Sequence, residues 1–127
     1  MSKRLLLCAA LASVTAAEAK DGEQIYKETC SACHATKFDK APQLGDRKAW
    51  RPLLEEGQAV VTGHAWVGVR NMPPRGGNND LSLEEFARAA AYMARAAGGK
   101  WPDPDAAMLA DIAAEASRRE HGGDGHQ

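Results

Sequence analysis

Two cysteines and a histidine stand together in the first third of this 127-residue chain, in the run Cys30-Ser31-Ala32-Cys33-His34. A C-x-x-C-H run is typical of covalent c-type haem attachment, in which each thiol forms a thioether with one vinyl group of the porphyrin. The neighbouring imidazole is then placed to bind the iron from one side. We therefore predict one covalent haem c, attached through Cys30 and Cys33, with His34 as the proximal iron ligand.

Three other uses of the same side chains compete with this interpretation: a redox-active dithiol, a structural disulfide and one half of a zinc site. A redox dithiol normally follows a strand of a βαβ unit, and no strand pattern precedes Cys30. A zinc site needs more soft ligands, and the one further cysteine, Cys8, stands in an N-terminal apolar segment. The flanking sequence favours the haem interpretation.

A second soft ligand stands in the run Met72-Pro73-Pro74-Arg75-Gly76-Gly77. A methionine followed by two prolines favours a stiff, extended loop that cannot become helix. Such a loop is suited to hold the sulfur against the distal face of the haem, and the two glycines permit positive φ angles. Because His/Met ligation is common in cytochromes and raises the reduction potential, we predict Met72 as the distal ligand. Met93 and Met108 lie at helical spacing and are expected in the core.

A loop at residues 35–45 follows the cysteine motif and contains Pro42. Metal-bound histidines usually donate their second ring N–H to a carbonyl or a carboxylate, which sets the ring orientation and the basicity of the ligand. Proline leaves neighbouring carbonyls free of helical pairing, so the backbone carbonyl of Pro42 is the candidate partner of His34. A plain turn without this contact is the alternative.

Trp50 and Arg51 stand in a short helix that is predicted to start at Asp46 and to be kinked or restarted at Pro52. An indole N–H and a guanidinium are both suitable donors to a haem propionate. Trp50 and Arg51 are therefore candidate cofactor-binding residues. The alternative places Trp50 in the core and leaves Arg51 in solvent.

The elements that would position these side chains are all helical. Apolar spacing and cap residues predict helices at residues 21–29, 46–57, 59–68, 83–97 and 106–119. Asp21 with Gln24 and Ser82 with Glu85 have capping-box spacing, and Asp103 is the expected N-cap of the last helix. The predicted fold is all-α: short helices around one covalently bound haem, plus an extra C-terminal helix.

The composition limits both the core and the partners. With two Phe, two Tyr and three Trp, the chain has few large side chains for a core. A buried tetrapyrrole adds a large apolar surface, so we expect the haem-free chain to be poorly folded. Lys and Arg number 16 against 17 Asp and Glu, and this near balance argues against a nucleic-acid partner.

Residues 1–19 have the features of an export signal. A positive pair precedes a short apolar stretch, and Ala17-Glu18-Ala19 matches a small-x-small cleavage site. The stretch has about 10 residues against the ~20 of a membrane-spanning helix, and an uncleaved anchor is the alternative. We predict a periplasmic protein with three regions: a signal peptide at 1–19, a cytochrome c domain at 20–99, and a linker, amphipathic helix and flexible tail at 100–127.

The order of several motifs resembles that of the class I c-type cytochromes, and within them the small bacterial cytochrome c5 kind. The matching segments are Ala41-Pro42-Gln43-Leu44-Gly45-Asp46, Ala49-Trp50, Met72-Pro73-Pro74-Arg75-Gly76-Gly77, Asp80-Leu81-Ser82 and Tyr92-Met93. The resemblance implies a small cytochrome c fold, thioethers from Cys30 and Cys33, and the axial ligands His34 and Met72. Two features depart from it: an extra cysteine pair of several family members is absent, and residues 100–127 extend beyond the usual final helix.

The resemblance also implies a carrier that moves single electrons outside the cytoplasm. Its partners would be redox proteins bound transiently, and it would have no catalytic residue. Two alternatives stay open: a haem sensor or small-ligand binder with a displaceable Met72, and a dedicated subunit of a periplasmic oxidoreductase contacted by the helix at 106–119. Membrane contact is expected only through partners or an uncleaved signal, while the oligomeric state, the electron donor and the acceptor stay open.

Overall fold

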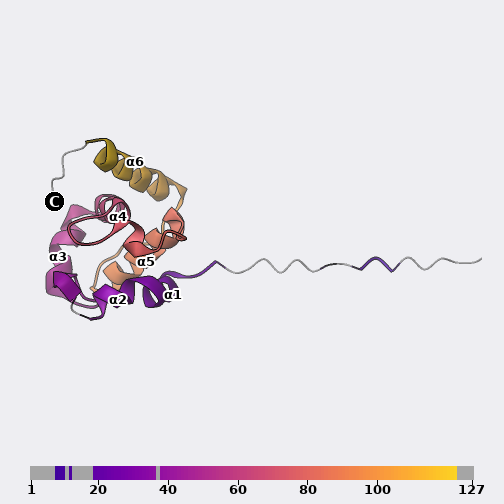
Figure 1. The fold of residues 1–127 in the computed structure, drawn as a ribbon, viewed down its shortest axis with the longest axis horizontal. Coiled ribbons are helices and arrows are strands. Elements are labelled where there is room, and N and C mark those ends of the chain that lie inside the picture. Colours follow the sequence, from indigo (N-terminus) through magenta and orange to yellow (C-terminus); the bar gives the residue numbers. More distant parts are fainter. Residues whose placement is uncertain (1–7, 11, 13–18, 37, 123–127) are drawn as a thin grey trace, which may run out of the picture.

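The structure is a computed structural model that describes residues 8–10, 12, 19–36 and 38–122 (Figure 1). Its helical elements are α1 (Gly22–Ile25), the π-helical η1 (Tyr26–Cys30), α2 (Ser31–His34), the 3-10 turn η2 (Phe38–Lys40), α3 (Arg47–Glu56), α4 (Gln58–Val67), the 3-10 turn η3 (Pro74–Gly77), α5 (Leu83–Ala96) and α6 (Ala106–Gly122). The β-type pairing of the described residues is an isolated bridge between Val69 and Met72. The described chain is therefore all-α, as predicted.

Two predicted regions fall mainly outside this description. Most of the predicted signal peptide at 1–19 lies outside the described residues, and so does the predicted tail after Gly122. None of the helices in the described part of the chain combines the length and apolar composition needed to cross a bilayer.

The first three elements follow one another without a break from Gly22 to His34. The carboxylate of Asp21 accepts a hydrogen bond from the Gln24 amide, and the Gln24 side chain accepts one from the Asp21 N–H, which is the predicted capping box. The predicted end at Thr29 is wrong, because the π-helical turn reaches Cys30 and α2 continues the helix to His34. No glycine or proline stands in the motif to stop it.

α3 begins at the predicted cap, where Asp46 accepts a hydrogen bond from the Ala49 N–H. It ends at Glu56, where Gly57 has a φ of 104° that side-chain-bearing residues rarely adopt. Pro52 lies inside α3 and does not divide it, contrary to the expected restart there. Because Pro52 has no N–H, the carbonyl of Lys48 lacks its helical hydrogen bond. Lys48 is exposed in the first turn of α3, so water can take the place of the missing donor.

α5 begins at the second predicted capping box, formed by Ser82 and Glu85. Its buried face packs on the first helix. At their crossing Gly22 lies against the Arg88 carbonyl, where a Cβ on Gly22 would clash. Beside it the rings of Tyr26 and Tyr92 meet with centroids 5.5 Å apart. The predicted contact between α5 and the first helix is therefore present, and Gly22 permits its closeness.

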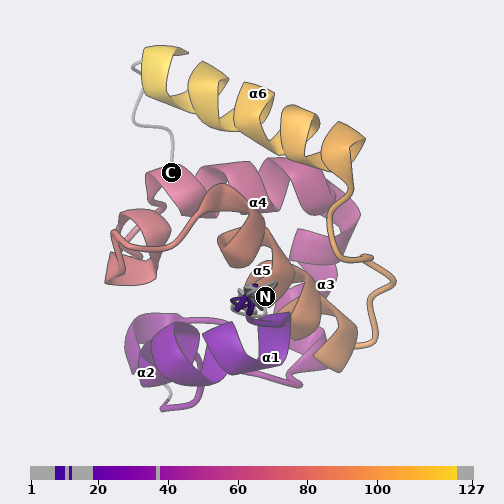
Figure 2. The ribbon, with the colours of Figure 1, turned by 90° about the vertical axis from the view of Figure 1, so that its right-hand side faces the viewer.

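α6 lies along α4 in both ribbon views (Figures 1 and 2). The predicted N-cap at Asp103 is wrong. Asp105 accepts a hydrogen bond from the Met108 N–H instead, while Asp103 pairs with Arg95 at 3.1 Å. The helix also continues past the predicted end at Arg119 as far as Gly122. Its apolar side faces the protein, with Ile112 and Ala116 buried.

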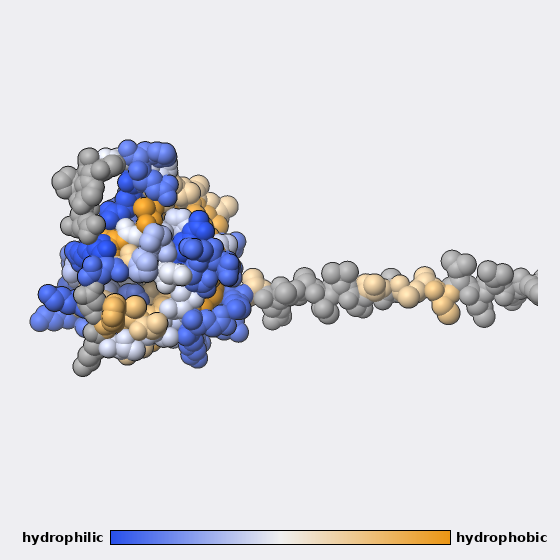
Figure 3. Space-filling view, viewed as in Figure 1, coloured by the Kyte–Doolittle hydropathy of each residue, from blue (hydrophilic) through white to orange (hydrophobic). Residues whose placement is uncertain are grey.

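The core lies between the first helix, α3, α4 and α5. Its buried members are Ile25, Tyr26, Cys30, Trp50, Leu81, Phe86, Ala89, Ala91, Met93, Ala94, Ala97 and Trp101. Met72 and Trp66 pack against this cluster and are half-buried. The surface seen in Figure 3 is mostly hydrophilic with small apolar patches, and Phe38 is a large apolar side chain left 56% exposed.

Candidate functional site

The two cysteines of the motif lie on consecutive turns of the first helical rod. Cys30 ends η1 and is 7% exposed, whereas Cys33 lies in α2 and is half-buried. Both thiols are free. Burial raises the pKa of the Cys30 thiol to about 11, with a further contribution from Cys33. Because the thiolate is the reactive form, the raised pKa makes this thiol less reactive than an exposed cysteine.

His34 follows the cysteines directly and its ring is held by the backbone of the next loop. Its Nδ1 lies 2.7 Å from the carbonyl oxygen of Pro42, and the residue is 8% exposed. A carbonyl only accepts hydrogen bonds, so Nδ1 carries the proton and Nε2 keeps its lone pair. The expected partner is therefore in place, and the ring presents one nitrogen suited to a metal.

Gln43 fastens the same loop and was missed by the sequence analysis. Its side-chain amide donates to the carbonyls of Cys33, at 3.1 Å, and Ala41, at 2.9 Å. The Leu44 N–H donates to the His34 carbonyl at 2.9 Å. These bonds hold the loop against the end of α2, so the Pro42 carbonyl stays in reach of the imidazole. A single glutamine in a loop gives no pattern that would have predicted this role.

Trp50 takes a different role from the propionate donor proposed on its sequence. Its indole N–H donates to the Gln43 carbonyl at 3.2 Å, and the residue is 3% exposed. Its ring meets Trp101 edge to face, with centroids 6.4 Å apart. The core alternative describes Trp50, because its one donor is already used. Arg51 is exposed and lines a surface hollow with Arg47 and Leu54, so its contact with a propionate stays a prediction.

Met72 closes a tight turn between α4 and η3. The Val69 N–H donates to the Met72 carbonyl at 3.1 Å, and the Met72 N–H donates back to Val69 at 2.9 Å. Within the turn, Arg70 has a φ of 51°. The extended Pro73 follows, and Gly76 and Gly77 have positive φ angles, as predicted from their residue type. The stiff segment therefore exists, and a turn at its start adds to its rigidity.

Arg75 was not singled out in the sequence, yet it fixes the far side of the same segment. It has a φ of 56°, and its guanidinium lies over the Trp66 ring at 4.5 Å from the ring centroid. It also donates to the Asn79 carbonyl at 3.2 Å. A cation over an indole face is attracted by the ring quadrupole. This contact attaches η3 to α4 by way of a half-buried side chain.

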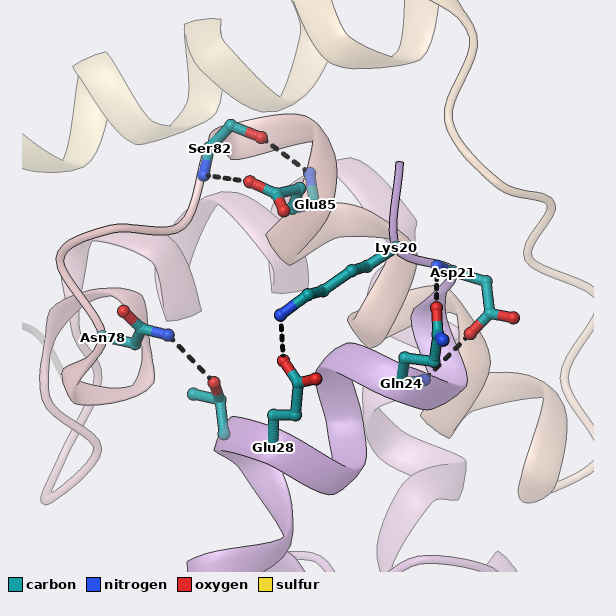
Figure 4. Close-up of polar contacts among 8 residues, drawn as sticks. Lys20, Asp21, Gln24, Glu28, Asn78, Ser82 and Glu85 are labelled. Atoms are coloured by element: carbon teal, nitrogen blue, oxygen red, sulfur yellow. Dashed lines mark hydrogen bonds and ion pairs between the residues drawn. The ribbon is translucent and has the colours of Figure 1, made fainter. Parts of the chain in front are cut away.

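A side-chain hydrogen bond joins the residue after the methionine segment (Met72–Gly77) to the helix that carries the cysteines (Gly22–His34). The Asn78 amide donates to the Thr29 hydroxyl at 3.1 Å, one residue before Cys30 (Figure 4). Figure 2 shows the chain between α4 and α5 above α2, on the same side of the molecule. The segment with Met72 and the helix with His34 are thus connected at this edge through Thr29.

Similarity to known proteins identifies the family. A family profile described as "Cytochrome C oxidase, cbb3-type, subunit III" matches residues 17–93, which is more than half of the chain. The chain belongs to the cytochrome c family. This cytochrome is monohaem, of class I and similar to cytochrome c5, so it carries one covalent haem c. Cys30, Cys33 and His34 are its C-x-x-C-H motif.

Three similar proteins are each matched over most of their length by about three fifths of this chain. Cytochrome c-555 of Chlorobaculum thiosulfatiphilum is 34% identical over 80 residues, which are 60% of this chain and 93% of that protein. Cytochrome c5 of Azotobacter vinelandii is 31% identical over 77 residues, which are 59% and 93% of the two chains. A chain in the crystal structure of an electron transfer complex of nitrite reductase with cytochrome c is 39% identical, with a TM-score of 0.58, over 60% of this chain and 93% of that one. The cytochrome therefore has the cytochrome c fold.

The side chains of this cytochrome suit haem c. Two free thiols, an imidazole with an available Nε2 and a half-buried thioether are the donors that such a haem uses. Among the described residues, no group of three or more His, Cys, Asp and Glu side chains suits a metal ion. The zinc alternative thus has no support in the described part of the cytochrome.

Proposed function

We propose that this cytochrome is a periplasmic carrier of single electrons, with His34 and Met72 as the axial ligands of its haem iron. The observation that supports this most is the 2.7 Å contact between His34 Nδ1 and the Pro42 carbonyl. It leaves Nε2 as the ring atom that can bind iron, next to the thiols that attach the haem.

The proposed distal ligand is Met72, and its surroundings support that role. The turn with Val69 and the extended Pro73 restrict the backbone on both sides of the methionine. The side chain is half-buried against the core rather than directed into solvent. A sulfur held in this way needs little rearrangement when the charge of its partner changes, which suits electron transfer.

Haem c supplies a one-electron couple. In the proposed arrangement His34 and Met72 occupy both axial positions, so no position is left for a substrate and we propose no enzymatic reaction. The core around Trp50 excludes water, and Gln43 keeps the proximal loop closed. These residues therefore tune and protect the site rather than transform a bound molecule.

We propose that the partners are redox proteins bound transiently. One similar chain occurs in a complex of nitrite reductase with cytochrome c, which illustrates such a partner for that protein. Interfaces of weak electron-transfer pairs are small, below ~1,200 Å². We also propose that residues 1–19 direct export to the periplasm, that residues 20–99 form the haem domain and that residues 100–127 form an extension of it.

The alternative of a dedicated oxidoreductase subunit relied on α6 as the contact to the enzyme. In the structure Ile112 and Ala116 of α6 are buried within the cytochrome itself. The apolar side of α6 is therefore already used, and the carrier is the better supported of the two. The sensor alternative differs from the carrier only in how easily Met72 leaves the iron.

The test is an absorption spectrum of periplasm-matured protein, ferric and ferrous, with and without carbon monoxide. We expect a c-type ferrous spectrum, a ferric sulfur-to-iron charge-transfer band and no response to carbon monoxide. Met72→Ala should keep the haem attached, abolish the sulfur band, bind carbon monoxide and lower the reduction potential by at least the ~59 mV of a tenfold change in a one-electron couple.

The matched control is Met108→Ala, which removes a half-buried methionine from α6. It should leave the sulfur band and the potential unchanged. A wild-type protein without a sulfur band that binds carbon monoxide readily would contradict the carrier and support the sensor.

A further inference from the structure

α6 lies outside the part of the chain that the family explains. The family match ends at residue 93, and α6 begins at Ala106. Two relatives are each matched over 93% of their own length by about 60% of this chain. Nothing in the family therefore says what this helix does, although it is packed along the full side of α4 (Figure 2).

The contact between α4 and α6 is close because of one glycine. A Cβ on Gly63 of α4 would lie 2.8 Å from the Glu115 Cβ and 3.0 Å from the Ile112 carbonyl oxygen. The first distance is shorter than real Cβ contacts and the second is tighter than nearly all of them, so glycine is the residue that allows α6 to approach this far. At the other end, the buried Gln58 side chain donates to the Pro102 carbonyl at 2.8 Å and fastens the start of α4 to the linker.

The last turns of α6 reach the end of α4. Arg119 Nε donates to the Gly68 carbonyl at 3.1 Å, in a half-buried position. Gly68 is the C-cap of α4, where carbonyls lack helical partners and a cation is favoured by the helix dipole. Arg119 therefore satisfies a carbonyl that α4 itself leaves unpaired.

Gly68 is also in contact with the methionine segment. A Cβ added to Gly68 would lie 3.4 Å from the Met72 carbonyl oxygen and 3.2 Å from Pro74 Cδ. The next residue, Val69, exchanges both backbone hydrogen bonds with Met72. A displacement of Gly68 is therefore transmitted directly to the turn that holds the methionine.

We propose that α6 is an intramolecular brace for the distal iron ligand, with Arg119 as a positioning residue that keeps Gly68 and the Met72 turn in place. This inference rests on the proposed ligation by Met72. By fixing the end of α4, the brace slows the dissociation of the methionine sulfur and keeps small ligands from the iron.

The test measures how fast imidazole binds to the full-length ferric protein, at imidazole concentrations where the loss of the methionine sets the rate. Arg119→Ala should accelerate binding about tenfold, the effect expected from losing one charge-assisted hydrogen bond at a part-buried site. Far-UV circular dichroism in the same buffer should show unchanged helix content, because global unfolding is not required.

The matched control is Arg118→Ala, the preceding residue, whose exposed side chain pairs with the half-buried Glu115 at 2.8 Å. Its binding rate should stay within about twofold of the wild type, since surface ion pairs contribute little. If Arg119→Ala does not give folded protein, Gly63→Ala separates the two helices instead and should raise the rate in the same direction.

The outcomes separate the two proposals. A wild-type protein without the sulfur band would refute the ligation by Met72 and the brace together. A wild-type protein with the band, in which Arg119→Ala binds imidazole no faster than Arg118→Ala, would overturn the brace and leave the proposed carrier intact.

Discussion

The ring of the proximal His34 is held by a backbone carbonyl, that of Pro42, and not by a side chain. His34 could be assigned a carbonyl partner from sequence because metal-bound histidines need one and Pro42 was close along the chain. Gln43 could not be assigned, because its two hydrogen bonds depend on a loop conformation that no local pattern encodes. For Trp50 the sequence left a propionate and the core open, because an indole N–H suits a propionate and a backbone carbonyl equally well.

The hydrogen bond of Trp50 leads to a prediction about stability. Trp50→Phe keeps an aromatic ring in the core but leaves the Gln43 carbonyl without its donor. We expect the free energy of unfolding to fall by about 1–2 kcal/mol, the usual consequence of an unpaired buried acceptor. Denaturant unfolding followed by circular dichroism measures this.

Trp101→Phe is the comparison for that measurement, since Trp101 packs edge to face on Trp50. It loses similar ring area, so it reports the packing contribution alone. Equal losses in the two variants would show that the Trp50 hydrogen bond contributes nothing measurable.

Among the helices, most local signals predicted well, whereas of the contacts between distant segments only the packing of α5 on the first helix was predicted. The caps at Asp21, Asp46 and Ser82 are each set by residues within one turn, and all three are present. The π-helical turn at Tyr26–Cys30 has no recognisable local signal, and the packing of α6 on α4 joins segments far apart in the chain. The amphipathic stripe of α6 was visible in the sequence, but the surface that covers it was not.

The crossing of the first helix with α5 gives a prediction at this scale. Gly22→Ala places a Cβ against the Arg88 carbonyl, so the two helices must separate. We expect a loss of about 1–3 kcal/mol in the free energy of unfolding, as for other overpacked contacts. Thermal or denaturant unfolding of the haem-loaded protein measures it.

Gly122→Ala is the control for this crossing, because a Cβ there meets nothing within 4 Å. It should leave the stability unchanged or raise it slightly, since alanine is the better helix former. If Gly22→Ala is as harmless as Gly122→Ala, the closeness of the crossing does not matter for stability.

The whole molecule is small, and its core depends on few large side chains. The all-α class and the donor set followed from the sequence because they depend on periodicity and on a compact motif. Among the helix contacts, the packing of α5 on the first helix followed from its apolar stripe, whereas the packing of α6 on α4 did not. We expect a chain of this kind to need the haem to complete its interior.

This dependence predicts the behaviour of a variant without thioether links. Cys30→Ala combined with Cys33→Ala should yield no covalent haem, seen as loss of haem staining on a denaturing gel. Because the haem surface then contributes no stable burial, we expect the helix signal in circular dichroism to fall by roughly half or more and the thermal transition to broaden.

A chain with both alanines that still carries covalent haem would contradict the attachment through these cysteines. Full helix content without haem would contradict the dependence of the fold on it. Cys8→Ala, which changes a cysteine outside the motif, should retain the haem and the fold.

The crossing at Gly22 also sets an order of events during folding. The first helix packs against Arg88 and Tyr92, which stand some sixty residues later in the chain and must be brought to it. Until then the segment from Asp21 to His34 is a short helix without a partner, and such helices are marginal in water. Until α5 packs, the thiols of the motif are therefore open, and the closed crossing leaves Cys30 only 7% exposed. We therefore expect haem attachment to precede the closure of this crossing.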